Sequence, residues 1–332
     1  MKFTINKLPI GYINGIRRAI LSDIKCVAID DKNVMCIKND TALHNEFMSH
    51  RISLIPCCID PQHYDELASY VFEINVTNKG TVDLDVTSKD ITVRIHDRVA
   101  SAEERDAIFP PCKLTKDYIL ITVLHPSQTF HATFSPSVGT AKEHVRWCPV
   151  STCTFYNSIA SSDETKKGEL ESARKRVAPK DVPHFNALES QRFYSTNERG
   201  EPSCIKFVLE SECQLSEPAI FRMGYEALCE RIRRAPNKMT SKMHEDLFVV
   251  TFEGEDHLFG NVLQTYLYNN FYLKDAIMYC GYYVTHPLEP SVVLKIRGPS
   301  NVCNENFIRE CTENLARDIE TVGEKIYNHI LK

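Results

Sequence analysis

The fold is decided by residues 247–269, whose sequence is LFVVTFEGEDHLFGNVLQTYLYN. The apolar run at 248–252 is short and continuous, which predicts a β-strand. The apolar residues then change to helical spacing, so we expect a helix over residues 259–269. Asp256 is a candidate N-cap of that helix, and His257 can form a local hydrogen bond there. The stretch therefore predicts a strand followed closely by a helix.

The beginning of the chain repeats this pattern. Shifted by 247 positions, Asn14 falls on Asn261, Ile20 falls on Leu267, and Ile5 falls on Phe252 in the strand. A sheet with helices on one face buries only that side, so two such units form a core by pairing their helical faces. This predicts an α+β fold in which two sheet-plus-helix units pair as a pseudo-twofold dimer within one chain. Chance similarity between short amphipathic helices is the alternative.

The remaining sequence separates the two copies. Short β-rich runs between turns and prolines predict an inserted β-rich domain, and the polar, charged stretch after it predicts an exposed loop. Residues around Pro236 break a helix and begin a linker. The predicted domains are a first dimerisation unit at 1–56 and 204–235, the β-rich insertion at 57–155, the polar loop at 156–203, the linker at 236–246 and the second unit at 247–332.

Charge and cysteine content narrow the classes of function. Thirty-nine basic and 44 acidic residues give a net charge of −5, whereas a stand-alone nucleic-acid binder is usually basic. The 13 cysteines contain no C-x-x-C pair, which favours reduced, mostly buried thiols. The sequence has neither an apolar signal core at Met1 nor a run of about 18 apolar residues, so we expect no membrane span.

Enzymatic motifs are missing from the sequence. It contains no G-x-S-x-G, no phosphate-binding P-loop, no H-E-x-x-H and no D-x-D-x-D metal signature. His44, His50 and His63 lie near Cys57-Cys58, but adjacent cysteines chelate one zinc ion poorly, so packing or subunit contact is the favoured interpretation. A thiol enzyme would need Cys148 beside His144. Arg17-Arg18 is either a solvated helix face or an interface pair.

Several motifs together resemble a known family. They are Asn14-Gly-Ile-Arg-Arg-Ala-Ile-Leu-Ser-Asp, Leu43-His-Asn-Glu-Phe-Met-Ser-His-Arg-Ile-Ser-Leu-Ile-Pro, Val86-Thr-Ser-Lys-Asp and Gly139-Thr-Ala-Lys-Glu-His-Val-Arg-Trp-Cys-Pro. This set resembles the alpha-like assembly subunit of multisubunit DNA-directed RNA polymerases, which is the D-like subunit in archaea and the third subunit of polymerase II in eukaryotes.

The C-terminal unit resembles the smaller partner of that subunit. Residues 254–263, GEDHLFGNVL, and 281–290, GYYVTHPLEP, are similar to the archaeal L-like subunit and the eleventh subunit of polymerase II. The resemblance therefore implies that two subunits, which form a heterodimer in the family, are fused here. Such a fusion resembles the arrangement in large cytoplasmic DNA viruses, which implies a cytoplasmic location in a viral factory or virion; a nuclear location is the alternative.

The resemblance implies a non-catalytic assembly platform in transcription. Its expected partners are the second-largest, beta-like subunit and the largest, beta-prime-like subunit; it also allows for a small zinc-binding polymerase subunit, and DNA and RNA are contacted only indirectly. No catalytic residue, cofactor or bound metal is expected, because only Cys57-Cys58 stands where the family often has a cysteine-rich metal element. The competing function is a stand-alone binder of single-stranded nucleic acid using the β-rich domain. The implied subunit-interface residues are Asn14, Arg17, Arg18, His50, Arg51, Lys142, His144, Trp147, Asp256, His257, Gly260 and Asn261.

Overall fold

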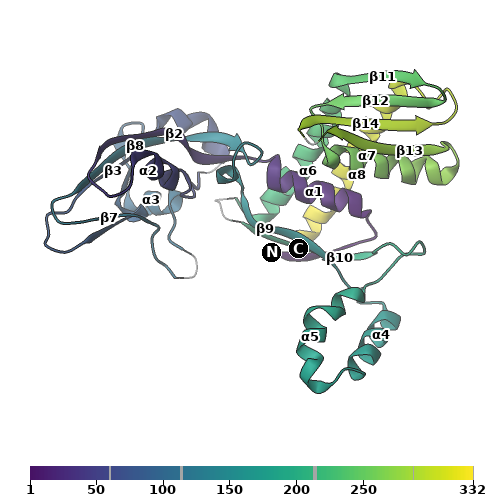
Figure 1. Ribbon diagram of the computed structural model, residues 1–332, viewed down its shortest axis with the longest axis horizontal. Coiled ribbons are helices and arrows are strands. Elements are labelled where there is room, and N and C mark those ends of the chain that lie inside the picture. The colour runs from purple at the N-terminus through teal and green to yellow at the C-terminus, as the bar shows by residue number, and fades with distance from the viewer. Residues whose placement is uncertain (60, 113–114, 212–214, 287, 332) are drawn as a thin grey trace. The chain divides into compact units, whose positions relative to one another are not determined.

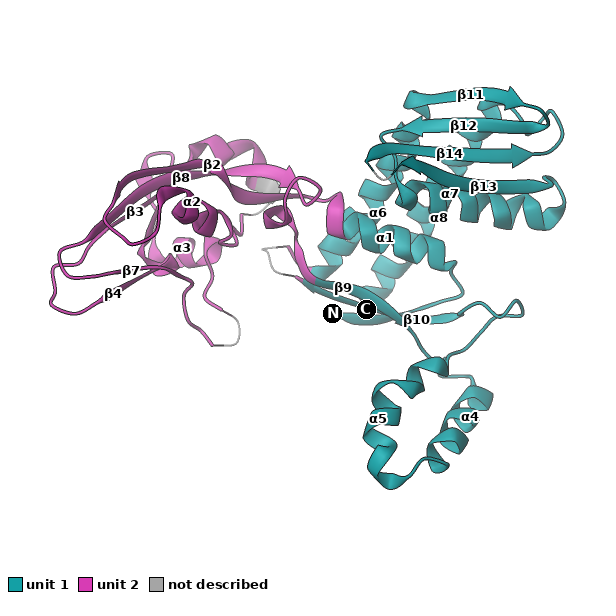
Figure 2. Cartoon of the chain, in the orientation of Figure 1, with its two compact units in different colours: residues 1–20, 152–210, 217–332 teal, residues 21–151, 211–216 magenta. Residues whose placement is uncertain are grey.

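A computed structural model describes residues 1–59, 61–112, 115–211, 215–286 and 288–331 (Figure 1). The chain forms two compact units (Figure 2). Unit 1 contains residues 1–20, 152–210 and 217–332, and unit 2 contains residues 21–151 and 211–216. No helix of the described part is long and apolar enough to cross a membrane.

Unit 1 contains an antiparallel four-stranded sheet of order β11-β12-β14-β13. The strands are β11 (Met239–His244), β12 (Leu247–Glu253), β13 (Tyr279–His286) and β14 (Glu289–Arg297). Helices α7 (His257–Asn270) and α8 (Glu305–Ile330) follow β12 and β14 in the chain, and α7 packs against β13 and β14. These elements match the strand–helix pattern predicted from residue 247 onward. Part of the expected linker, however, is the edge strand β11, which pairs with β12 from Met239 to His244.

A second sheet of unit 1 has the order β1-β10-β9. It comprises β1 (Lys2–Asn6), β10 (Cys204–Ser211) and β9 (Val150–Asn157), and two helices, α1 (Ile10–Ser22) and α6 (Glu217–Arg234), follow β1 and β10 in the chain. The Phe3 ring stacks on Phe207 at 5.3 Å between centroids and meets Phe221 of α6 edge-on at 5.4 Å. The apolar stripe of α6 therefore seals one side of this sheet.

Glycines let helices α1, α6 and α7 of unit 1 approach closely. A Cβ atom on Gly224 of α6 would lie 2.3 Å from Ile20 of α1, and one on Gly15 of α1 would lie 2.7 Å from Val262 of α7. Both distances are too short for a Cβ atom. The backbone at each glycine therefore lies directly against a side chain of the neighbouring helix. Helices from both ends of the chain thus pack against one another in unit 1.

Unit 2 is built on a five-stranded sheet of order β2-β8-β3-β5-β6. Phe72, which is fully buried, lies against Phe109 and Phe134 at 5.0 and 5.5 Å between ring centroids. Strands β4 and β7 form a separate antiparallel pair. The bounds are β2 (Lys25–Asn39), β3 (Tyr70–Thr77), β4 (Leu84–Thr87), β5 (Ile91–Ile95), β6 (Arg98–Val99), β7 (Leu120–Leu124) and β8 (Thr129–Thr140), with the helices α2 (Asn45–Ser53) and α3 (Ala102–Ile108).

The structure corrects several expectations in detail. Residues 25–39 form one strand with an irregular register between Ile29 and Val34, where the turn-forming residues Asp30-Asp31-Lys32-Asn33 lie. Strand β2 pairs with β8 and lies in unit 2 together with α2, whereas residues 1–20 lie in unit 1. The expected polar loop at 156–203 contains α4 (Glu164–Lys175) and α5 (Val182–Ala187). Helix α2 begins at Asn45, and its N-cap residue His44 makes no side-chain cap bond.

Candidate functional site

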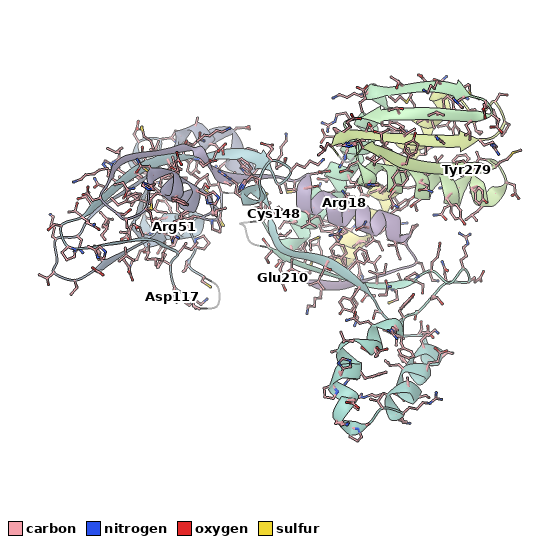
Figure 3. The ribbon with its side chains drawn as sticks, in the orientation of Figure 1. Arg18, Arg51, Asp117, Cys148, Glu210 and Tyr279 are labelled. Carbon is pink, nitrogen blue, oxygen red and sulfur yellow. The ribbon has the colours of Figure 1, made fainter. Side chains whose placement is uncertain are left out.

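Unit 1 gathers predicted residues from both ends of the chain. Asp256 caps α7, as expected, because its Oδ1 accepts a hydrogen bond from the Leu258 backbone N–H at 2.8 Å. Its other oxygen, Oδ2, lies 3.4 Å from Nη2 of Arg18 on α1 (Figure 3). Arg17, one residue earlier, donates from Nε to Asn14 Oδ1 at 3.0 Å. We call this set the first cluster; it comprises Asn14, Arg17, Arg18, Asp256, His257, Gly260 and Asn261.

Tyr282 of β13 organises the α7 side of the first cluster. A Cβ on Gly260 would lie 2.4 Å from the Tyr282 ring, so only glycine lets the helix pass this side chain. The Tyr282 hydroxyl lies 3.3 Å from His257 Nδ1. Burial raises the pKa of Tyr282, and its hydrogen bond with Asn261 partly offsets that effect. Sequence reasoning included Tyr282 only as part of the 281–290 motif and did not name it as a site residue, because the sequence does not show that it contacts α7.

A buried ion pair between α6 and the turn before α7 fixes the position of Asp256 in the first cluster. Nε of Arg231 on α6 lies 2.8 Å from Glu255 Oε2, and its Nη2 lies 3.1 Å from Asp256 Oδ1. Arg231 and Glu255 are only 5% and 7% exposed. Asp256 is therefore held between Arg231 on one side and Arg18 on the other. Sequence reasoning missed Arg231 and Glu255; the available signal was an arginine three residues after Leu228, at the edge of the apolar stripe of α6.

Unit 2 holds the other predicted residues. Arg146 donates from Nε to His144 Nδ1 at 3.1 Å, and its Nη1 lies 2.8 Å from Asp31 Oδ1. The pKa of Asp31 is lowered by hydrogen bonds, first from Asp30 and then from Arg146. The His144 ring lies edge-on to His50 at 6.4 Å between centroids. We call His50, Arg51, Lys142, His144 and Trp147 the second cluster.

Two members of the second cluster are engaged in structural contacts. Trp147 covers Gly139, where a Cβ would lie 2.6 Å from the indole ring, and its Nε1 donates to Ser137 O at 3.4 Å. Lys142 Nζ lies 3.0 Å from Asp23 Oδ1. These contacts fix the segment after β8 against its own unit. They place Trp147 in the core, where it is 6% exposed.

Helix α2 presents an exposed stripe that includes two predicted residues. Phe47, His50, Arg51 and Leu54 follow helical spacing, and Phe47 and Leu54 are 62% and 45% exposed. The opposite face buries Met48 and Ile52. Arg51 (Figure 3) folds back, donating from Nε to Ile121 O at 2.9 Å and from Nη2 to Leu120 O at 3.0 Å. Arg51 thus anchors α2 to β7, while Phe47 and Leu54 face outward.

The thiols lie in surroundings that disfavour thiolate chemistry. Burial and the neighbouring Cys58 raise the pKa of Cys57 well above its usual value. The Cys148 thiol donates to Val150 O at 3.3 Å, whereas His144 Nδ1 accepts from Arg146. His144 Nδ1 is therefore already engaged with Arg146 and does not accept a proton from Cys148 in this arrangement. The described cysteines are free thiols, and Cys213 lies outside the described residues, as does Pro287 of the 281–290 motif.

The sequence of this chain is similar to known RNA polymerase subunits. Residues 248–325 match the family model of the RNA polymerase Rpb3/Rpb11 dimerisation domain. The chain is 31% identical over 171 residues to DNA-directed RNA polymerase subunit Rpo3 of Pyrobaculum arsenaticum, covering 49% of this chain and 61% of that protein. It is 26% identical over 179 residues to subunit 3 of DNA-directed RNA polymerases II, IV and V of Arabidopsis thaliana, covering 46% and 52%. A conjugation stage-specific protein of Tetrahymena thermophila is 28% identical over 220 residues, covering 57% and 69%.

These matches confirm the predicted resemblance to the third-subunit family. The chain spans 52–69% of the length of these three relatives. The matched domain begins in β12 and ends within α8, and it includes the α7 half of the first cluster. Residues 248–325 therefore match the RNA polymerase Rpb3/Rpb11 dimerisation domain, and the chain is similar to Rpb3/Rpo3-type subunits.

Proposed function

We propose that this chain is a non-catalytic assembly subunit of a DNA-directed RNA polymerase. The observation that carries the proposal is the exposed stripe of α2. Phe47 is mostly exposed and Leu54 is about half exposed. The opposite face of the same helix is buried against unit 2. Large apolar side chains grouped on one exposed face are typical of a protein–protein contact. Arg51 holds this helix in place through two backbone carbonyls, so the stripe is presented by a fixed element.

The second part of the proposal is that the chain contains both members of the family's dimer. The matched dimerisation domain supplies α7 and α8, and α1 and α6 pack against them through Gly15 and Gly323. Fusion raises the effective concentration of one half for the other and fixes their ratio at one to one. This supports a third-plus-eleventh-subunit fusion in which residues 247–332 are the eleventh-subunit-like half.

The proposed partners are the second-largest and largest polymerase subunits, with a small zinc-binding subunit as a further candidate. Permanent interfaces of this kind bury about 2,000 Å² or more and contain apolar anchors. A viral source with action in the cytoplasm is part of the proposal, because a fused pair resembles the viral arrangement; a nuclear site is the alternative. We assign the contacts to the exposed residues of the two clusters and of the α2 stripe.

Replacing both Phe47 and Leu54 with glutamate should break the contact with a large subunit. Each anchor of this kind contributes about 2 kcal/mol or more, so co-purification of the second-largest subunit should fall at least about 30-fold. The measurement is co-expression with the large subunits and quantification of those retained on the tagged chain. Val82→Glu is the matched control, because Val82 is 74% exposed in the same unit but is not on α2. Equal retention by both variants would contradict the proposal.

Arg17→Glu tests the contact proposed for α1. Arg17 is half-buried and donates to Asn14, so reversing its charge should leave the fold intact and weaken assembly by about 10-fold. Arg18→Glu is a less selective variant, because it places a carboxylate beside Asp256 within the chain itself. The measurement is the same co-purification, with thermal unfolding as the check on the fold. If Arg17→Glu assembles like the wild type, Arg17 does not belong to the interface.

A further inference from the structure

The outer face of the β11-β12-β14-β13 sheet carries an arrangement that assembly does not require. Strand residues alternate between faces, and Phe248, Val250 and Phe252 of β12 point to the helices. The opposite face therefore carries Val249 and its cross-strand neighbours. On β13 this face contains Tyr279, Gly281 and Tyr283, which pair with Arg297, Lys295 and Val293 of β14.

Two tyrosines are presented on this face as stacking surfaces. Tyr279 and Tyr283 are 47% and 45% exposed (Tyr279 is labelled in Figure 3). A Cβ on Gly281 would lie 2.5 Å from the Tyr279 hydroxyl and 3.0 Å from its Cζ, so the Tyr279 ring lies across the glycine. A ring that lies over the backbone keeps its outer face open to solvent. Such a ring can stack with a planar ligand group without rearranging the sheet.

Two lysines lie on the same face of the sheet as the tyrosines, one beside Tyr283 and one on the far edge strand β11. Lys295 Nζ lies 4.9 Å from the centroid of the Tyr283 ring, and Lys242 of β11 lies opposite Val249. Arg297 pairs with Asp246 at 2.8 Å, while the acidic residues Glu253 and Glu289 stand at strand ends. The face therefore presents two lysines and two aromatic rings, with the side chains of Val249 and Val293 buried beneath them (8% and 5% exposed). It is locally basic although the whole chain is acidic.

We propose that this face binds single-stranded nucleic acid. Open sheets that bind single strands use exposed aromatic rings to stack bases and nearby cations to contact phosphates. Every base has a π-face, so two tyrosines with two lysines predict binding with little sequence preference. An acidic protein segment would be drawn to the lysines but would leave the open tyrosine rings unexplained. The proposal differs from the expectation that nucleic acid is contacted only through the complex, and it does not depend on the proposed assembly function.

The test measures binding of the full chain to a fluorescein-labelled 12-nucleotide oligouridylate by fluorescence anisotropy. The logarithm of the affinity should fall with the logarithm of the salt concentration with a slope of about −1.4, from two phosphate contacts at about 0.7 each. Lys242→Glu should reduce this slope by about 0.7 or more. Lys274→Glu is the charge-matched control, because Lys274 is exposed in the turn after α7. A duplex of equal length should bind more weakly than the single strand.

Replacing Tyr279 and Tyr283 with alanine should weaken binding by about 10-fold for each tyrosine. Replacing them with phenylalanine should preserve binding, because stacking does not need the hydroxyl. The matched control is Tyr268→Ala with Tyr272→Ala, since those rings are also exposed (38% and 39%) and stack at 5.1 Å beside α7, away from this face.

Three results would overturn the proposal. The first is no salt-dependent binding by the wild-type chain. The second is equal binding by the Tyr279/Tyr283 and Tyr268/Tyr272 alanine variants, provided that both keep the wild-type melting temperature. The third is a Tyr279/Tyr283 variant that binds the oligonucleotide normally but retains less of a polymerase subunit, which would make the face a protein interface. Assembly can fail or succeed independently of each result.

Discussion

Replacing Arg231 with methionine is expected to lower the free energy of unfolding of unit 1 by about 3–5 kcal/mol. The guanidinium lies 2.8 Å from Glu255 Oε2 and 3.1 Å from Asp256 Oδ1, in a site where Arg231 and Glu255 are 5% and 7% exposed. Methionine fills much of the same volume but leaves the Glu255 carboxylate buried without its guanidinium. The cost comes from a buried charge that has lost this partner and not from lost packing.

The effect should be visible as a lower melting temperature in circular dichroism, by about 2–4 °C for each kcal/mol. Arg233→Met is the matched control on the same helix. Arg233 pairs with Glu320 at 2.6 Å, but the two side chains are 37% and 44% exposed, so that pair contributes about 1 kcal/mol or less. The double variant Arg231→Met with Glu255→Met should recover most of the loss, because it removes both buried charges. A single variant as stable as the control would contradict this account.

The Arg231 pair also bears on how the two ends of the chain recognise each other. Arg231 lies on α6, and Glu255 and Asp256 lie on the turn before α7, within the matched dimerisation domain. Apolar helix faces alone tolerate shifted packing, whereas a buried charged pair permits one alignment. We therefore expect this pair to contribute to the alignment of α6 with the second half of the chain.

The regular elements of the dimerisation units could be predicted from the sequence because their burial is one-sided. The apolar spacing of α8 follows its buried residues Ile308, Cys311, Leu315 and Ile319. Strand β12 ends where the apolar run ends, and Asp256 caps α7 as its residue type suggests. In these cases local sequence and tertiary packing agree, so the pattern alone carried enough information.

Other elements lack such a pattern in their sequence. Strand β8 occupies the middle of the β-rich sheet, but Pro136 and polar residues interrupt its apolar alternation. Strand β11 is an edge strand with mostly exposed, polar residues, so nothing in its sequence distinguishes it from a linker. Helix α4 has no buried residue; its charges form pairs such as Lys166–Glu169, which stabilise a helix without an apolar face. Strands β8 and β11 form because they pair with neighbouring strands, and α4 is stabilised by charge pairs. Hydrophobic periodicity in the sequence detects neither cause.

The candidate sites were predicted in part. Family motifs identified Arg18, Asp256 and Asn261, and the fold of unit 1 brings Arg18 to Asp256, which lies 238 residues later in the sequence. The contacts of Tyr282 and Arg231 in the first cluster depend on how β13 and α6 meet the α7 turn, so no local motif encodes them. Arg51 remains a predicted interface residue, and within the chain its guanidinium contacts two carbonyls of β7. Tertiary geometry decides whether such a side chain serves the fold or a partner.

Replacing Gly323 with leucine should destabilise unit 1 by about 3 kcal/mol, the upper part of the range for overpacked cores. A Cβ at this buried position of α8 would lie 2.5 Å from Cγ and 2.6 Å from Cδ1 of the Tyr225 ring on α6. The ring is rigid at Cγ, close to its own backbone, and Phe221 packs beside it at 6.0 Å between centroids. The ring cannot turn aside, so α6 and α8 must move apart.

Gly168→Leu is the control that separates crowding from helix propensity. Gly168 lies in α4 with no atom within 4 Å of its would-be Cβ, so leucine there should stabilise that helix by about 0.8 kcal/mol. The same substitution thus has opposite signs at the two sites. A second variant, Gly323→Leu with Tyr225→Ala, should regain part of the stability by vacating the crowded space. If thermal unfolding shows Gly323→Leu to be neutral, the close approach of α6 and α8 cannot be the contact that pairs the two halves of the chain.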